Sequence, residues 1–138
     1  METLTDLECL SLCREMARES RALRRTLDSL EERLGPAGLR GSCAPGHLPG
    51  TNEPRYAAEQ HRNAYLRQLE ENEQRLAAIR PRLRQILRLA PNSRNRAILE
   101  DYYAYGETCE AIAETTRLSP RHVQRIRAEF TRRLEAAA

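Results

Sequence analysis

The chain has 138 residues, of which 23 are basic and 20 acidic, and its net charge is +3. This length is enough for one small domain with an extension, and it is too short for a large enzyme core. With a single Phe and no Trp, and without a Ser-His-Asp set, a phosphate-binding loop or paired catalytic carboxylates, the sequence predicts neither an enzyme nor a bound cofactor.

The sequence predicts an all-α protein of the cytoplasm. No apolar run approaches the length of a membrane span, and the first residues are acidic where a signal peptide would be basic and then apolar. We therefore expect no membrane partner. Four cysteines in that compartment are more typical of thiols than of disulfides.

The first predicted element is a long helix over residues 1–34. Small and apolar side chains recur in it at alternating spacings of three and four, which places them on one stripe of a helix. The members of this stripe are Cys13, Met16, Ser20, Leu23, Leu27, Leu30 and Leu34.

Residues 35–54 follow, and they contain five of the six glycines and four of the seven prolines. No packed helix or strand tolerates that density of both residue types. We therefore predict a long flexible loop over this segment.

A second long helix is predicted over residues 55–90, with Leu76 and Leu83 on its apolar stripe. Pro81 lies inside the pattern and lacks a backbone donor, which predicts a kink or a fresh helix start. Asn72 also falls on the stripe. A lone polar residue there either fixes register or oligomer number, or it faces water near a frayed turn, and the pattern does not separate these readings.

The two narrow stripes, joined by a loop, predict an antiparallel helical hairpin or a coiled coil. Such a hairpin could set the oligomeric state of the protein, with a homo-oligomer as one candidate assembly. The stripes could instead pack within one chain. RNA polymerase is a further candidate partner for the hairpin.

Residues 93–138 predict three short helices. Pro91 ends the preceding helix, and Ser93 is expected to cap a helix over about residues 94–105. Gly106 is expected to end that helix. Its predicted buried face includes Ile98 and Leu99.

Two more helices follow, each with its own start signal. Thr108 is a plausible cap for the stretch CEAIAETT, in which Ile112 is the apolar anchor. Ser119 caps the last helix, and Pro120 takes its first position, where a missing amide donor has no cost. Two helices joined by a turn of three or four residues predict a helix-turn-helix, whose second helix can enter the major groove of double-stranded DNA.

At 100° per residue the last helix divides into two sides. Its core side consists of Val123, Ile126, Phe130 and Leu134. The opposite side is predicted to read bases through Arg121, Gln124, Arg125 and Ala128. Arg can donate two bonds to guanine, Gln can bond adenine, and Ala permits close approach. Contacts with DNA phosphates are expected from Thr108, Arg117, Ser119, His122, Arg127, Arg132 and Arg133.

The segment RAILEDYYAYGETCEAIAETTRLSPRHVQRIRAEFTRRL resembles region 4 of sigma-70 factors, where a threonine precedes an IA pair and a capped recognition helix follows. The whole chain resembles small phage and prophage transcriptional regulators that carry such a region behind a helical hairpin with a Gly-rich loop. The resemblance implies sequence-specific DNA binding in a bacterial host cell and control of phage genes, often late genes.

This chain departs from the family pattern at three positions. Arg117 replaces the turn glycine, Thr116 replaces an apolar residue, and Phe130 occupies a position that is usually small. An Arg in a left-handed turn would cost about 1 kcal/mol.

Two alternatives remain open at this stage. The chain could be an oligomeric, small terminase-like assembly factor that binds DNA with weak sequence specificity. The spacings Cys9-x3-Cys13 and Cys43-x3-His47 could also supply four zinc ligands. The intervening helix separates the two pairs within one chain, which leaves a site between antiparallel subunits. Cys9 and Cys13 would otherwise be small packing residues.

Overall fold

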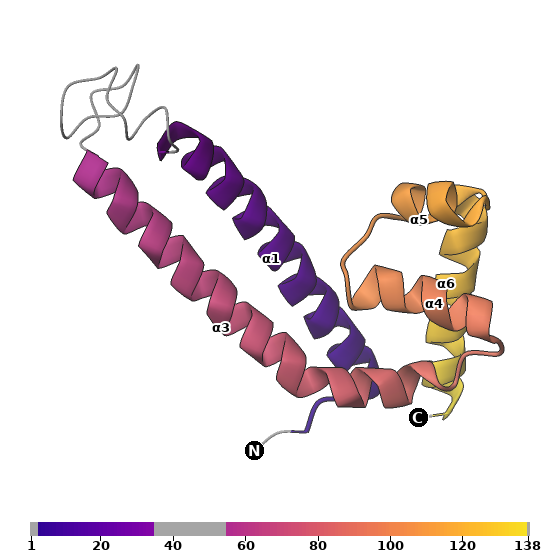
Figure 1. Cartoon of the computed structure of the whole chain (residues 1–138). Helices are drawn as coiled ribbons and strands as arrows, with labels where there is room; N and C mark the ends of the chain where they lie inside the picture. Colours follow the sequence, from indigo (N-terminus) through magenta and orange to yellow (C-terminus); the bar gives the residue numbers. More distant parts are fainter. Residues whose placement is uncertain (1–2, 35–54, 138) are drawn as a thin grey trace. The chain divides into compact units, whose positions relative to one another are not determined.

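The structure, a computed structural model, describes residues 3–34 and 55–137, and over these ranges it is all-helical with five helices and no strand. This confirms the predicted all-α class. The predicted loop over residues 35–54 lies outside the described residues. The helices are α1 (Asp6–Leu34), α3 (Arg55–Leu87), α4 (Ser93–Tyr103), α5 (Cys109–Thr116) and α6 (Pro120–Ala137) (Figure 1).

Helix α1 begins with a reciprocal capping interaction. The backbone N–H of Glu8 donates to Thr5 Oγ1 at 3.1 Å, and the backbone N–H of Thr5 donates to Glu8 Oε1 at 3.1 Å. Two amide groups without helical partners are satisfied in this way. The helix therefore starts at Asp6, five residues after the start of the predicted segment, and it ends at Leu34 as predicted.

Helix α3 runs through Pro81 without interruption. The missing N–H of Pro81 removes one hydrogen bond of the helix. Apolar side chains on both sides of it, including Leu76 and Leu83, are buried and stabilise the flanking turns. A fresh helix start at Pro81 is therefore wrong, whereas a kink there stays a prediction.

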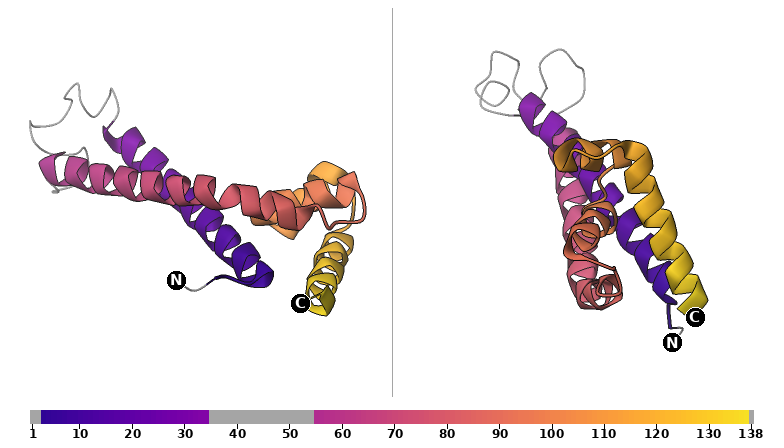
Figure 2. Two further views of the ribbon diagram at one scale, coloured as in Figure 1. Left: turned by 90° about the horizontal axis from the view of Figure 1, so that it is seen from below. Right: turned by 90° about the vertical axis from the view of Figure 1, so that its right-hand side faces the viewer.

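The chain forms two compact units, Met1–Glu19 with Gln74–Ala138 and Ser20–Glu73. Helices α1 and α3 each contribute residues to both units. The first unit contains all of α4, α5 and α6, seen from two further directions in Figure 2. It thus extends well beyond the predicted DNA-binding domain of residues 93–138.

The core of the first unit combines all five helices. Helix α5 packs against α6, and α4 contacts both. Helices α1 and α3 contribute side chains that are almost fully buried. Helices α4, α5 and α6 contribute their predicted apolar faces. Its buried members include Cys9, Leu10, Cys13, Leu83, Leu87, Ile98, Leu99, Ile112, Val123, Ile126, Phe130 and Leu134.

The second unit has a smaller core, in which Leu30 and Leu34 pack with Ala58 and the half-buried Tyr65. Asn72 is also buried, with 5% of its surface exposed, and its Nδ2 has no hydrogen-bond partner. The reading in which Asn72 faces water is therefore wrong. A role in fixing register stays a prediction.

The apolar stripes of the two long helices are buried within one chain. In the first unit Leu76 packs with Met16 and Ala17. Of the two readings of the stripes, this burial favours packing within the chain. A homo-oligomer consequently has no support from them.

Candidate nucleic-acid interface

Helix α4 begins one residue earlier than predicted. Asn92 is its N-cap, with Oδ1 accepting from the backbone N–H of Asn95 at 2.8 Å. The prediction that Ser93 caps this helix is therefore wrong, because Ser93 is its first residue. Both residues are good caps, and sequence alone does not decide between neighbours. The helix ends at Tyr103, and the left-handed Gly106 (φ 66°) follows within the linker to α5.

Helix α5 has the predicted bounds. Thr108 Oγ1 accepts from the N–H of Ala111 at 3.1 Å, as expected of an N-cap. Arg117 is the C-cap, and it has the left-handed conformation (φ 61°, ψ 30°) expected where it replaces a turn glycine. The next residue, Leu118, donates its N–H to Ala113 O at 3.1 Å and packs half-buried against the core.

Helix α6 also starts as predicted. Ser119 Oγ accepts from the N–H of His122 at 3.1 Å, and Pro120 is the first helical residue. The predicted core side is buried, with exposures from 1% at Val123 to 5% at Ile126. The cap and the apolar side together fix which side of α6 is exposed.

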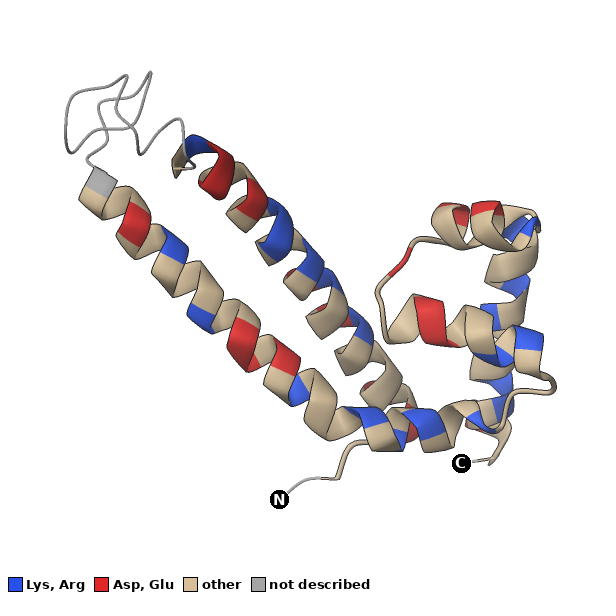
Figure 3. Cartoon of the chain, viewed as in Figure 1, with Lys and Arg blue, Asp and Glu red and all other residues tan. Residues whose placement is uncertain are grey.

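The four predicted base-reading residues share that exposed side. Arg121, Gln124, Arg125 and Ala128 are all exposed. Figure 3 shows arginines along α6, which also contains the acids Glu129 and Glu135, and it shows acidic residues on α4 and α5. The exposed side of α6 therefore combines positive charge with side chains that can bond base edges.

The predicted phosphate-contacting residues differ in their exposure to solvent. Thr108, Arg117, Ser119, Arg132 and Arg133 are exposed. His122 and Arg127 are half-buried. Arg133 also donates from Nη1 to the backbone O of Leu89 at 3.2 Å.

Among the predicted phosphate-contacting residues, Arg127 contacts an aromatic ring of α4. Its guanidinium carbon lies 5.0 Å from the centre of the Tyr102 ring, and its Nε is buried without a hydrogen-bond partner. Arg127 follows Val123 by four residues, so it shares the core side of α6. The structure thus gives Arg127 a contact with Tyr102, and its predicted contact with a DNA phosphate stays a prediction.

Sequence reasoning missed a set of contacts from α1 to the linker between α4 and α5. Arg14 Nη1 donates to the backbone O of Tyr102 at 2.6 Å and to that of Glu107 at 3.0 Å. Arg18 Nη1 donates to the backbone O of Gly106 at 3.1 Å. These bonds satisfy carbonyl groups in the last turn of α4 and in the linker that follows, and they hold the residues that precede the cap of α5.

Comparisons with protein-family models, curated proteins and solved structures give no significant match.

The candidate zinc ligands lie partly inside and partly outside the described residues. No cluster of three or more metal-binding side chains occurs within residues 3–34 and 55–137. Cys9 and Cys13 are fully buried in the core, and burial raises the pKa of Cys13 to about 12. Both act as small packing residues. Cys43 and His47, the other candidate zinc ligands, lie outside the described residues.

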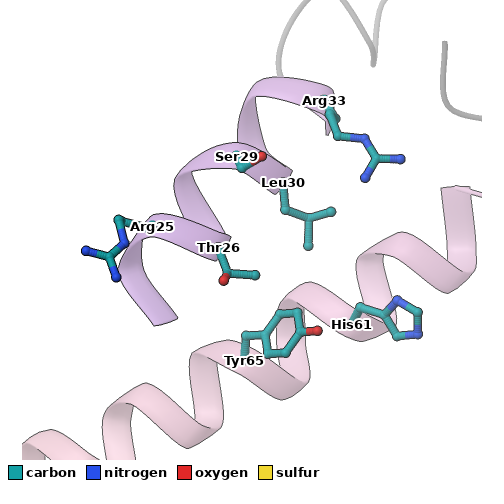
Figure 4. Close-up of a pocket in the computed structure, with 7 residues that line it drawn as sticks. All are labelled: Arg25, Thr26, Ser29, Leu30, Arg33, His61 and Tyr65. Carbon is teal, nitrogen blue, oxygen red and sulfur yellow. The ribbon is translucent and has the colours of Figure 1, made fainter. Parts of the chain in front are cut away.

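The second unit has a cleft of about 420 Å³ with polar and basic walls (Figure 4). Arg25 and Arg33 lie at opposite ends of the cleft and point away from each other, while Leu30 points toward Tyr65. The two guanidinium groups therefore do not converge on one position where an anion could bind.

Over the described ranges, every helix is too short or too polar for a bilayer span.

Proposed function

We propose that this chain is a sequence-specific DNA-binding transcriptional regulator, in which α5 and α6 form a helix-turn-helix and α6 reads the major groove. One observation carries the proposal. The exposed side of α6 bears Arg121, Gln124, Arg125 and Ala128, while the opposite side is buried in the core. This arrangement presents two potential guanine readers and one adenine reader on one rigid helix.

The charge distribution supports DNA as the partner. Between residues 117 and 133 the chain has six arginines and a single acid, Glu129. Arg84, Arg88, Arg94 and Arg96 add four more exposed arginines from the end of α3 to the start of α4. Binding would release counterions from DNA, so its affinity should fall steeply with salt concentration.

The resemblance to sigma-70 region 4 and to small phage regulators makes the proposal more specific. By this analogy the chain controls phage or prophage genes in the cytoplasm of a bacterial host, through a three-helix domain behind a helical hairpin. RNA polymerase is the second partner that the analogy suggests. The alternative is an oligomeric, small terminase-like assembly factor with weak sequence specificity. It needs a homo-oligomer, and the burial of Leu76 and Leu83 within one chain removes the support that the apolar stripes gave to one.

The test begins with selection of bound duplexes from a random pool, followed by sequencing. Dissociation constants are then measured for a selected duplex and a scrambled duplex. Arg121→Ala combined with Arg125→Ala should reduce the selected-to-scrambled affinity ratio by about 30-fold or more, because each bidentate contact to a base contributes about 1–3 kcal/mol of discrimination. Helicity measured by circular dichroism should not change, since both side chains are exposed.

The matched control is Arg25→Ala combined with Arg67→Ala, which removes the same charge from two exposed arginines of the second unit. This variant should keep the selected-to-scrambled ratio. An unchanged ratio in the Arg121 and Arg125 variant would refute base reading by α6. Failure of the wild type to enrich any sequence would refute the proposal as a whole.

A further inference from the structure

The first unit contains a groove of about 480 Å³ lined by residues of α1, α4 and α6. Three arginines line it, Arg14 and Arg18 from α1 and Arg127 from α6, and Glu15 is the single acid among the described lining residues. Its volume is in the range of sites for small molecules. The charges on its walls therefore favour an anion.

Two of these guanidinium groups meet at one aromatic ring. The guanidinium carbon of Arg14 lies 3.5 Å from the centre of the Tyr102 ring, and that of Arg127 lies 5.0 Å from it. The ring attracts both cations. It holds them close together in a half-buried position, although a neutral ring does not cancel their charges.

The arginines have donors beyond those used in structural contacts. Arg14 and Arg18 bond backbone carbonyls through Nη1, and each guanidinium carries five N–H donors. Arg127 Nε is buried without a hydrogen-bond partner. A buried donor in this state is costly and is satisfied when an acceptor reaches it.

The positive charges of the three arginines also repel one another. Burial lowers the pKa of Arg14, and the like charges of Arg18 and Arg127 lower it further. Arg14 nevertheless keeps its charge near neutral pH, because a guanidinium is not deprotonated in proteins. An anion among the three arginines would reduce the mutual repulsion and supply acceptors at the same time.

We propose that this groove is a binding site for a small anion with two or more carboxylate or phosphate groups, held by the guanidinium groups of Arg14, Arg18 and Arg127. The hydroxyl group of Ser11 on the same wall can add a neutral hydrogen bond, whereas Thr131 Oγ1 already donates to the backbone O of Arg127 at 3.0 Å. The site is distinct from the proposed DNA-reading side, because Arg127 lies on the core side of α6 and Arg121 and Arg125 lie on the exposed side.

The test is thermal unfolding of the full chain with citrate or pyrophosphate as the probe, compared with sodium chloride at equal ionic strength. A ligand that binds the folded state raises Tm. The wild type should melt about 5 °C higher, or more, at a saturating probe concentration. Arg127→Gln and Arg18→Gln should each lose most of this shift, measured against the Tm of the same variant in chloride.

Arg25→Gln is the matched control, because Arg25 is an exposed arginine of the same helix α1 and belongs to the second unit. It should keep the full shift. Arg18 is exposed, so its variant remains informative if Arg127→Gln does not fold. The proposal is overturned if the wild type shows no shift beyond chloride, or if both groove variants keep the full shift.

A second comparison distinguishes the groove from the proposed DNA-reading side. Arg121→Gln combined with Arg125→Gln should leave the shift with citrate and pyrophosphate unchanged. If this variant loses the shift while the groove variants keep it, the anions bind on the exposed side of α6 and the groove proposal is wrong. This outcome would leave the proposed DNA binding intact.

Discussion

At the scale of single residues, two residues with left-handed backbone conformation flank helix α5. One is a glycine and the other is an arginine. Gly106 precedes the helix with φ 66°, and Arg117 ends it with φ 61°. A Cβ placed on Gly106 would lie 3.1 Å from the backbone N of Arg18 and 3.2 Å from Ala17 Cβ. Position 106 therefore requires glycine, because any other residue there would adopt a left-handed backbone and crowd α1. The side chain of Arg117 is exposed, so Arg117 has only the cost of the left-handed backbone.

Gly106→Ala should accordingly lower the free energy of unfolding by about 2 kcal/mol, from the left-handed backbone and from crowding against α1. Arg117→Gly should raise it by up to about 1 kcal/mol, because a left-handed helix end suits glycine. Urea unfolding of both variants provides the measurement. A loss of stability in Arg117→Gly would show that its left-handed conformation is not a significant cost.

At the scale of the helical elements, the buried Asn72 of α3 gives a prediction about the second unit. Its Nδ2 is buried without a partner, and such a group costs about 1–3 kcal/mol. Asn72→Leu should therefore raise the stability of the chain by about 1–2 kcal/mol. The measurement is urea unfolding together with sedimentation, which reports any change in oligomeric state.

Asn95 of α4 is the matched control for this substitution. It is also buried, at 9% exposure, but its Oδ1 accepts from Arg94 Nη2 at 3.2 Å. Asn95→Leu should bring no gain, because it removes a hydrogen bond that is made. An equal rise in stability for both variants would mean that general hydrophobicity, rather than the unpaired amide, explains the Asn72 result.

The helices of this chain follow from local rules, which is why most could be predicted from the sequence. The caps Thr108 and Ser119 and the first-turn Pro120 act within three residues of their own helix, and helical periodicity located the buried side of α6. The contacts of Arg14 and Arg127 could not be predicted in this way. Arg14 meets a carbonyl 88 residues further along the chain, and no local pattern signals such a pairing.

At the scale of the whole molecule, the core shows why a boundary at residue 93 does not isolate a folding unit. Cys9 and Leu10 of α1 and Leu83 and Leu87 of α3 are at most 2% exposed, and they belong to the same cluster as Ile112 of α5. The sequence placed a domain boundary after Pro91, where the second long helix was predicted to end, whereas α3 ends at Leu87. Long-range burial instead places the ends of α1 and α3 with the last three helices, and composition carries no signal for that.

A fragment of residues 93–138 should consequently lack a cooperative thermal transition, because removal of α1 and α3 exposes the apolar sides of α4, α5 and α6. Burial of a single large apolar side chain contributes about 1.5–3 kcal/mol, and a small domain has a total stability of only about 5–15 kcal/mol. Circular dichroism melting of the fragment and of the full chain is the measurement. A separately prepared segment of residues 1–92 should restore cooperative melting when it is added to the fragment. Cooperative melting of the fragment alone, within a few degrees of the full chain, would show that α4, α5 and α6 are stable without α1 and α3.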